Sequence, residues 1–219
     1  MATNIHTAMH DDDVNQYVKA SVDFALANVP AHKGQKIAFI DLGCNDGYST
    51  HYATDDSRVK TAIGVELYGE PIPVQKKLPK GLSVTFLREN LEDPLLPFKL
   101  QKAIQENELD VSDHTGVIFL NHVIEHLYTP YQLGLSLQQI AAKFDTCYLF
   151  VAVPEATSPW ATWEGHYSLW THDFLEAFFS NFGFVTASGQ EMRCFRGTNL
   201  ELWRLFAHAQ QEQGYADNL

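Results

Sequence analysis

Short apolar runs alternate along this chain with segments of helical periodicity, and this alternation decides the fold class. The runs that we predict as buried strands span residues 37–42, 62–65, 84–87, 117–120 and 148–153. The segments that we predict as helices span residues 14–26, 98–109, 131–144 and 171–182, and a further helix begins at about residue 48. Buried strands separated mostly by helices predict a parallel sheet covered on both faces. Two late runs, 184–187 and 202–207, have no helix between them, which favours a closing antiparallel hairpin.

The length of 219 residues fits one large domain, and we find no internal repeat, low-complexity tract or linker. We therefore predict a mobile N-terminal segment over residues 1–12 and a single domain over residues 13–219. The chain shows neither a secretory signal nor a run of about eighteen apolar residues, so we expect no membrane span. Its three cysteines, Cys44, Cys147 and Cys194, form no zinc or disulfide pattern, which favours a reducing, cytoplasmic setting.

The balance of charge bears on the partners of the chain. The sequence has 27 acidic against 15 basic residues and a net charge of −12. Long-range electrostatics of this sign oppose the approach of a polyanion. The densest basic stretch holds only Lys76, Lys77 and Lys80. We therefore expect no nucleic-acid partner and predict a small or weakly charged substrate.

Ligands of open parallel sheets bind beyond the carboxyl ends of the strands, so the candidate site lies in the residues after each predicted strand. The first strand runs into DLGCNDG, residues 41–47, in which Gly43 and Gly47 allow the backbone to approach a ligand closely. Glu66 ends the second strand, where one carboxylate can accept both hydroxyls of a ribose. The fingerprint G-x-G-x-x-G is missing, which disfavours a nicotinamide oxidoreductase.

Six motifs follow one another between residues 37 and 207: IDLGCNDG, IGVEL, FLRENLEDPLLPF, FLNHVIEHL, LFVAVPE and GHYSLWTHDFLEAFFSNFGF. Together they resemble the class I S-adenosylmethionine-dependent methyltransferase family. The resemblance implies an α/β fold with a doubly wound, mostly parallel seven-stranded sheet of the Rossmann-like type. It also implies S-adenosylmethionine as the cofactor.

The same resemblance implies which residues bind the cofactor. The loop after the first strand cradles the methionine end, Glu66 holds the ribose, and Asn90 with Leu91 lies at the adenine. Asn45 stands where a glycine is common, and Asn90 stands where an acid is common. The implied cofactor-binding residues are Asp41, Gly43, Asn45, Gly47, Glu66, Asn90, Leu91 and Asn121.

Two histidines follow the fourth predicted strand, where the family places the sulfonium and the substrate. His122 and His126 are our candidates for catalysis, because a histidine of near-neutral pKa suits removal of a proton from the acceptor. The alternative interpretation is that Glu125 and His126 only hold the loop in place. Methyl transfer itself needs mainly alignment of the nucleophile, carbon and sulfur, with exclusion of water.

A metal site is a further alternative at the same loop. Certain ubiquinone-type O-methyltransferases and small-RNA 3′-end methyltransferases resemble this segment in having Glu-His after the fourth strand, and they hold a divalent ion with it. The candidate ligands here are Glu125, His126 and His166, with His122 at a position where the RNA enzymes have a glutamate. Because of that departure, we expect no metal.

Aromatic residues gather after the fifth predicted strand. Trp160, Trp163 and Tyr167 are our candidates for the acceptor pocket, as an apolar wall or a lid. From the family architecture, Tyr17 of the first predicted helix joins them. An alternative interpretation is that these rings only cover the end of the sheet.

The sequence therefore predicts an S-adenosylmethionine-dependent methyltransferase that acts on oxygen, nitrogen or carbon of a small molecule. The alternative is a non-catalytic cofactor-binding module or regulatory partner that keeps the fold. Asn45 and Asn90, which depart from the family pattern, motivate this alternative.

Overall fold

The computed structural model of the protein describes residues 12–30, 34–69, 81–107, 110–196 and 199–209. The predicted mobile segment 1–12 lies outside the described residues, apart from Asp12, which begins the first helix. The lysines at 76, 77 and 80 also lie outside them.

In the described part of the chain, seven strands form one sheet in the order β3-β2-β1-β4-β5-β7-β6. The strands are β1 (Lys36–Leu42), β2 (Val59–Glu66), β3 (Ser83–Arg88), β4 (His114–Asn121), β5 (Thr146–Pro154), β6 (Phe184–Arg196) and β7 (Asn199–His208). Neighbouring strands from β3 to β5 are parallel, whereas β7 runs antiparallel to both β5 and β6. This arrangement confirms the predicted parallel sheet and its closing hairpin.

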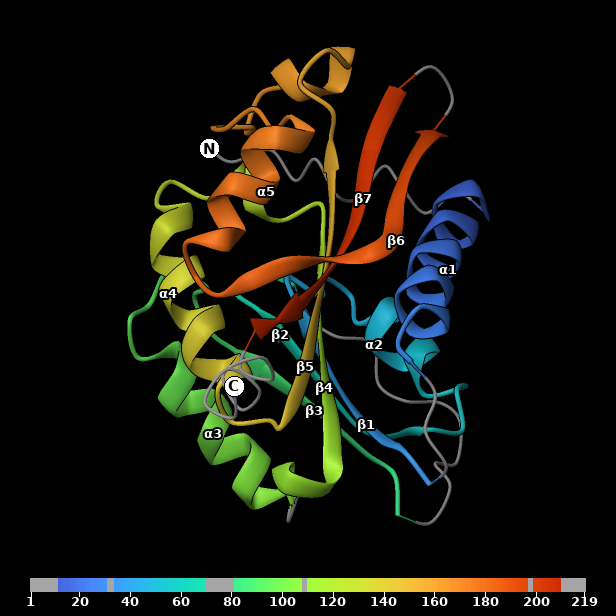
Figure 1. The fold of residues 1–219 in the computed structure, drawn as a ribbon, viewed down its shortest axis with the longest axis vertical. Helices are drawn as coiled ribbons and strands as arrows, with labels where there is room; N and C mark the ends of the chain where they lie inside the picture. The colour runs from blue at the N-terminus through green and yellow to red at the C-terminus, as the bar shows by residue number, and fades with distance from the viewer. Residues whose placement is uncertain (1–11, 31–33, 70–80, 108–109, 197–198, 210–219) are drawn as a thin grey trace, which may run out of the picture.

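Helices cover both faces of the sheet, as predicted (Figure 1). One face carries α1 (Asp12–Ala27) and α2 (Tyr48–Ala53), and the other carries α3 (Leu96–Glu106), α4 (Pro130–Ala141) and α5 (His172–Ser180). The pleat of β1 shows why. Phe39 packs in the cluster of α1, and the next residue, Ile40, packs in the cluster of α3 to α5. Both side chains are fully buried, so β1 is apolar on both faces.

The sequence predicted that these helices exist, but it predicted their ends less accurately. The helix predicted to reach Phe144 ends at Ala141, because the last turn tightens: Lys143 and Phe144 donate to carbonyls only three residues back. Phe144 is instead a buried part of the connection to β5. The predicted start of α5 is confirmed, since the Thr171 hydroxyl accepts a hydrogen bond from Phe174 N at 3.2 Å.

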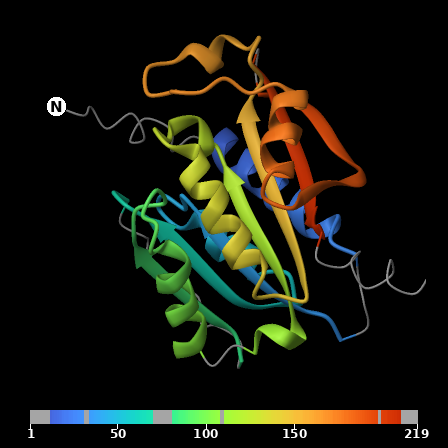
Figure 2. The same ribbon diagram turned by 60° about the vertical axis from the view of Figure 1, so that its left-hand side comes forward.

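The order of the strands fixes where a ligand can bind. From β1 the chain proceeds to β2 and β3 on one side, and then returns to β4 and β5 on the other side. Ligands of open α/β sheets bind where the strand order reverses, which here is at the carboxyl ends of β1 and β4. The segment after β5 lies beyond the same edge (Figure 2). Within the described ranges, none of the helices has the length and apolar character needed to cross a bilayer.

Candidate functional site

The loop after β1 has a backbone shape that few residue types adopt. Gly43 and Gly47 have φ angles of +81° and +80°, and Asn45 between them has a φ of +48°. Asparagine is one of the few residues that tolerate this left-handed region, so it fits where glycine is common. A Cβ atom on Gly43 would lie 2.5 Å from Val123 Cγ2. The loop after β1 is therefore packed directly against the turn after β4.

Asp41 lies beneath this loop and is 2% exposed. One of its carboxylate oxygens accepts hydrogen bonds from Ser49 Oγ at 2.5 Å and Thr50 Oγ1 at 2.6 Å, both in α2. Burial raises the pKa of Asp41 to about 6, although the two hydroxyl donors act in the opposite direction. In this structure Asp41 thus holds the start of α2 against the end of β1. Its predicted contact with the cofactor stays a prediction.

Glu66 lies at the mouth of the loop, as its position at the end of β2 predicts. Its Oε2 accepts a hydrogen bond from Asn45 N at 3.1 Å, and its Oε1 accepts from Leu67 N at 2.8 Å and Tyr68 N at 2.9 Å. The chain then passes very close to the loop, because a Cβ atom on Gly69 would lie 2.6 Å from Asn45 O. A carboxylate that already accepts three N–H donors is oriented to accept other donors at the same place.

Asn90 and Leu91 follow β3 beside Glu66, since Glu89 N donates to Glu66 O at 3.2 Å. Asn90 is exposed, and its side-chain oxygen accepts from Glu92 N at 2.9 Å within its own turn. Leu91 is only 7% exposed and packs into the core. The structure therefore places both residues at the predicted edge of the sheet, and their contact with adenine stays a prediction.

His122, directly after β4, is the centre of a polar network. Its backbone φ is +55°, and its ring nitrogens lie between two buried glutamates. Nδ1 lies 3.0 Å from Glu125 Oε1, and Nε2 lies 3.0 Å from the Tyr17 hydroxyl and 3.4 Å from Glu201 Oε2. The Tyr17 hydroxyl also donates to Asn121 Oδ1 at 3.4 Å. The network therefore joins α1, the turn after β4, and β7.

The charges of this network favour an imidazolium. Burial alone lowers the pKa of His122, but hydrogen bonds and attraction from Glu125 and Glu201 outweigh it and raise the pKa to about 9. Contact with His122 correspondingly lowers the pKa of Glu201 against the effect of burial. A histidine that is already protonated at neutral pH does not accept a proton from a substrate. The contacts with Glu125 and Glu201 favour a positioning role for His122, and its predicted role as a base stays a prediction.

Sequence reasoning missed Glu201 and Trp203 as parts of this network. Trp203 Nε1 donates to the Tyr17 hydroxyl at 3.2 Å and to Glu201 Oε2 at 3.3 Å. The signal in the sequence is a carboxylate within the mostly apolar run LELWRLF. Glu201 is fully buried there, and a buried carboxylate requires a partner. Tyr17 was predicted to join the aromatic segment after β5, but it lies against His122 and Trp203.

The second predicted catalytic histidine, His126, lies at the end of the 3₁₀ helix η3 (Ile124–His126). Its Nδ1 lies 2.9 Å from Gly165 O, and its ring meets that of His166 edge to face with centroids 4.6 Å apart. Burial lowers the pKa of His166. Glu125, His126 and His166, the predicted candidate metal ligands, are thus brought together from two loops.

The aromatic segment after β5 is anchored at its base. Ala156 N donates to Trp170 O at 2.8 Å, and Tyr167 N donates to Glu125 O at 2.7 Å. Of the three predicted pocket residues, Trp163 and Tyr167 are about half exposed, and the rings of Trp160 and Trp163 lie 5.7 Å apart. The segment therefore offers accessible aromatic surface beside η3, and its contact with an acceptor stays a prediction.

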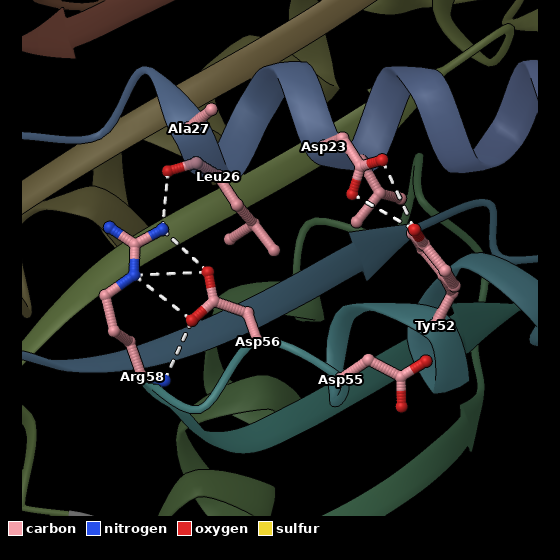
Figure 3. Close-up of a pocket in the computed structure, with 8 residues that line it drawn as sticks. Asp23, Leu26, Ala27, Tyr52, Asp55, Asp56 and Arg58 are labelled. Atoms are coloured by element: carbon pink, nitrogen blue, oxygen red, sulfur yellow. Dashed lines mark hydrogen bonds and ion pairs between the residues drawn. The ribbon is translucent and has the colours of Figure 1, made fainter.

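A separate hollow of about 510 Å³ lies between α1, α2 and the start of β2 (Figure 3). Arg58 and Asp56 form an ion pair at 2.7 Å within it, and Tyr52 donates to Asp23. This hollow is beside the amino end of β2, whereas the glycine loop and His122 lie at the carboxyl ends of β1 and β4. It is therefore distinct from the candidate site.

The parallel sheet with β7 inserted between β5 and β6, the glycine-bearing loop after β1 and the acid that ends β2 together define the fold of the class I S-adenosylmethionine-dependent methyltransferases. A family model described as a methyltransferase domain matches residues 11–188. The chain belongs to this family. The family predicted from the six motifs is therefore confirmed, as is the prediction of a methyltransferase.

Solved structures share the fold at low sequence identity. The 1,6-didemethyltoxoflavin-N1-methyltransferase of Burkholderia thailandensis, with 1,6-didemethyltoxoflavin and S-adenosylhomocysteine bound, has a TM-score of 0.60 and 19% identity over 92% of this chain and 84% of that chain. An S-adenosylmethionine-dependent methyltransferase of Anabaena variabilis has a TM-score of 0.58 and 15% identity over 90% of this chain and 86% of that chain. A mutant 16S rRNA (adenine(1408)-N(1))-methyltransferase of Catenulisporales acidiphilia has a TM-score of 0.54 and 11% identity over 92% of this chain and 93% of that chain. Comparison with curated protein sequences gives no significant match.

Proposed function

We propose that this methyltransferase transfers the methyl group of S-adenosylmethionine to an oxygen, nitrogen or carbon atom of a small-molecule acceptor. The observation that carries the proposal is the Glu66 carboxylate, hydrogen-bonded to Asn45 N at 3.1 Å across the mouth of the loop after β1. The Burkholderia thailandensis structure with S-adenosylhomocysteine bound and the family model both support this choice of cofactor.

In this proposal the cofactor lies along the carboxyl ends of β1, β2 and β3. Gly43 and Gly47 have no Cβ atom and adopt positive φ angles, so the backbone of this loop can lie close to the methionine end of the cofactor. The ribose hydroxyls donate to Glu66 in place of backbone N–H groups. Asn90 lies at the adenine, beside Glu66.

On the acceptor side, the network around His122 shapes the wall next to the methyl group. With Glu125 and Glu201 ionised and His122 protonated, the network carries one net negative charge, which favours a cationic sulfonium nearby. Trp160, Trp163 and Tyr167 supply an apolar surface that excludes water during alignment of the reacting atoms. Of the two histidines predicted to act as a base, His126 is left for that role in the proposal.

The net charge of −12 supports a small molecule over nucleic acid as acceptor, because it opposes the approach of a polyanion. The structural neighbours act on both kinds of substrate, so their names do not decide between them. The buried thiols of Cys44 and Cys147 agree with the reducing, cytoplasmic location that we include in the proposal.

Calorimetry with S-adenosylhomocysteine tests the cofactor site. Replacing Glu66→Ala removes hydrogen bonds to a charged group, each worth about 1.5–3 kcal/mol, so affinity falls about tenfold or more. Glu106→Ala, on the exposed surface of α3, is the matched control and leaves affinity unchanged. Equal affinity for wild type and Glu66→Ala would remove Glu66 from the site.

A turnover screen with labelled S-adenosylmethionine tests the acceptor class. Total small RNA and a panel of hydroxyl, amine and acidic-carbon compounds are offered in parallel. Labelling of a compound in the panel and not of RNA is the expected result. Labelling of RNA would refute the small-molecule acceptor, and tight cofactor binding without turnover across the screen would favour the alternative of a non-catalytic module.

A further inference from the structure

Three side chains with metal-binding atoms converge beside the aromatic segment. Glu125 and His126 come from η3 after β4, and His166 comes from the loop after β5, 40 residues further along the chain. One ligand atom from each residue lies within 4.8 Å of the others. Two imidazoles and a carboxylate are therefore held together by the fold and not by proximity in sequence.

The side chain of Glu125 gives independent support for a ligand at this cluster of three side chains. Its side chain is 1% exposed, and its Oε1 is occupied by His122 Nδ1 at 3.0 Å. Its Oε2 is buried and has no hydrogen-bond partner among the described residues. Leaving a buried charged oxygen unsatisfied costs more than about 1–3 kcal/mol, so such an atom requires a ligand that offers positive charge or a proton.

The surroundings of the two histidines orient them for coordination. Gly165 O accepts a hydrogen bond from His126 Nδ1 at 2.9 Å, so the proton of a neutral ring sits there and Nε2 is the nitrogen with the lone pair. A backbone carbonyl on the far nitrogen is the usual support of a metal-bound histidine. The hydrogen bond from Tyr167 N to Glu125 O at 2.7 Å fixes the loop of His166 to η3.

The geometry points to a binding site for one divalent transition-metal ion, held by Glu125, His126 and His166. Metal–nitrogen and metal–oxygen bonds of about 2.0–2.2 Å place ligand atoms at most about 4.4 Å apart, so small side-chain rotations close the site. A set of two imidazoles and one carboxylate suits zinc or iron(II) better than calcium or magnesium. Three protein ligands leave room for an exchangeable ligand, and a metal there lowers the pKa of a bound hydroxyl. This inference replaces our expectation from sequence that no metal is bound.

Metal binding by the full chain tests the inference without depending on activity. The purified protein is freed of metal with a chelator, dialysed and titrated with Co²⁺, and binding is followed by visible absorption and by metal content after gel filtration. We expect one equivalent of Co²⁺ per chain, displaced by Zn²⁺. His166→Gln should weaken binding at least about a hundredfold, since changes in the surroundings of a ligand alone cost 10- to 100-fold.

His114→Gln is the matched control. His114 is also buried, and its Nδ1 also contacts a backbone carbonyl, that of Asp110, at 2.7 Å, but it lies at the amino end of β4. Its replacement should leave Co²⁺ affinity unchanged. Circular dichroism verifies that each variant is folded, and Glu125→Gln serves as the second ligand variant if His166→Gln is not. Failure of the wild-type protein to bind Co²⁺ saturably, or equal affinity in wild type and a folded ligand variant, would overturn the inference and leave His126 as the candidate base.

Discussion

Replacement of Gly43 by alanine tests whether the loop after β1 is as tightly defined as its geometry implies. An alanine at a φ of +81° enters the left-handed region, which costs about 1–2 kcal/mol. Its Cβ would also lie 2.5 Å from Val123 Cγ2 and 3.1 Å from Cγ1, and overpacking of this kind costs about 1–3 kcal/mol. We therefore expect Gly43→Ala to lower the free energy of unfolding by about 2–5 kcal/mol.

Gly81 provides the matched control, because its φ is +83° and an added Cβ would meet nothing within 4 Å. Gly81→Ala should cost only the backbone part, about 1–2 kcal/mol. A third variant, Gly43→Ala with Val123→Ala, removes both Cγ atoms that the new methyl group meets. The double variant should be more stable than the sum of the two single changes predicts, by about 1–3 kcal/mol.

Urea unfolding gives the stability of each variant, and calorimetry with S-adenosylhomocysteine gives its affinity. Because the methyl group at residue 43 must displace the loop or Val123, we expect the affinity of Gly43→Ala to fall about tenfold or more, with that of Gly81→Ala unchanged. The reasoning would be refuted if Gly43→Ala were no more destabilising than Gly81→Ala. Additive effects of Gly43→Ala and Val123→Ala would equally exclude the steric explanation.

Three further predictions concern Asp41, Trp163 and Thr171. Because the folded-state pKa of Asp41 is raised from 3.8 to about 6, its contribution to stability is present below pH 3.8 and is lost as the pH rises through about 6. Between pH 5 and 7.5 the wild type should lose about 1–2 kcal/mol relative to Asp41→Asn in urea unfolding, and parallel pH profiles would contradict this. Trp163→Ala should slow turnover while S-adenosylhomocysteine affinity stays within about twofold, since this half-exposed ring is placed on the acceptor side; loss of cofactor affinity with normal use of the acceptor would exclude that role. Thr171→Ala removes the cap of α5 and should cost about 1 kcal/mol, or about 2–4 °C in thermal unfolding, whereas Thr171→Ser should restore most of it; equal melting temperatures for all three proteins would contradict the capping role.

Much of the fold was predictable because the strands of a parallel sheet carry their own signature. Buried runs such as 37–42 and 148–153 are apolar on both faces, and the glycines at 43 and 47 mark the turn at which the first run ends. Glu66 was predictable for the same reason, since the end of a strand fixes where its side chain emerges. Thus the positions of the residues that we predict to bind the cofactor follow from local pattern.

The acceptor side depends on contacts that local pattern does not contain. Tyr17, His122 and Glu201 meet although they are separated by 105 and 79 positions in the chain. The hydrogen bonds from Ser49 and Thr50 of α2 to Asp41 were likewise not predicted, because they depend on how α2 packs against the end of β1. The raised pKa of His122 likewise depends on Glu125 and on Glu201 of β7, and the contact with β7 is not contained in the local sequence around His122.

The anchoring of the aromatic segment has a consequence for altering the enzyme. Hydrogen bonds join Ala156 to Trp170, Tyr167 to Glu125, and His126 to Gly165. The later part of the segment therefore holds η3 in place. Residues 157–164 take no part in these hydrogen bonds. Loop grafts that aim at a new acceptor should therefore exchange residues 157–164 and retain 165–170. A graft of the whole segment would remove the hydrogen bonds to η3. It would therefore disturb the turn after β4, although no residue of that turn is exchanged.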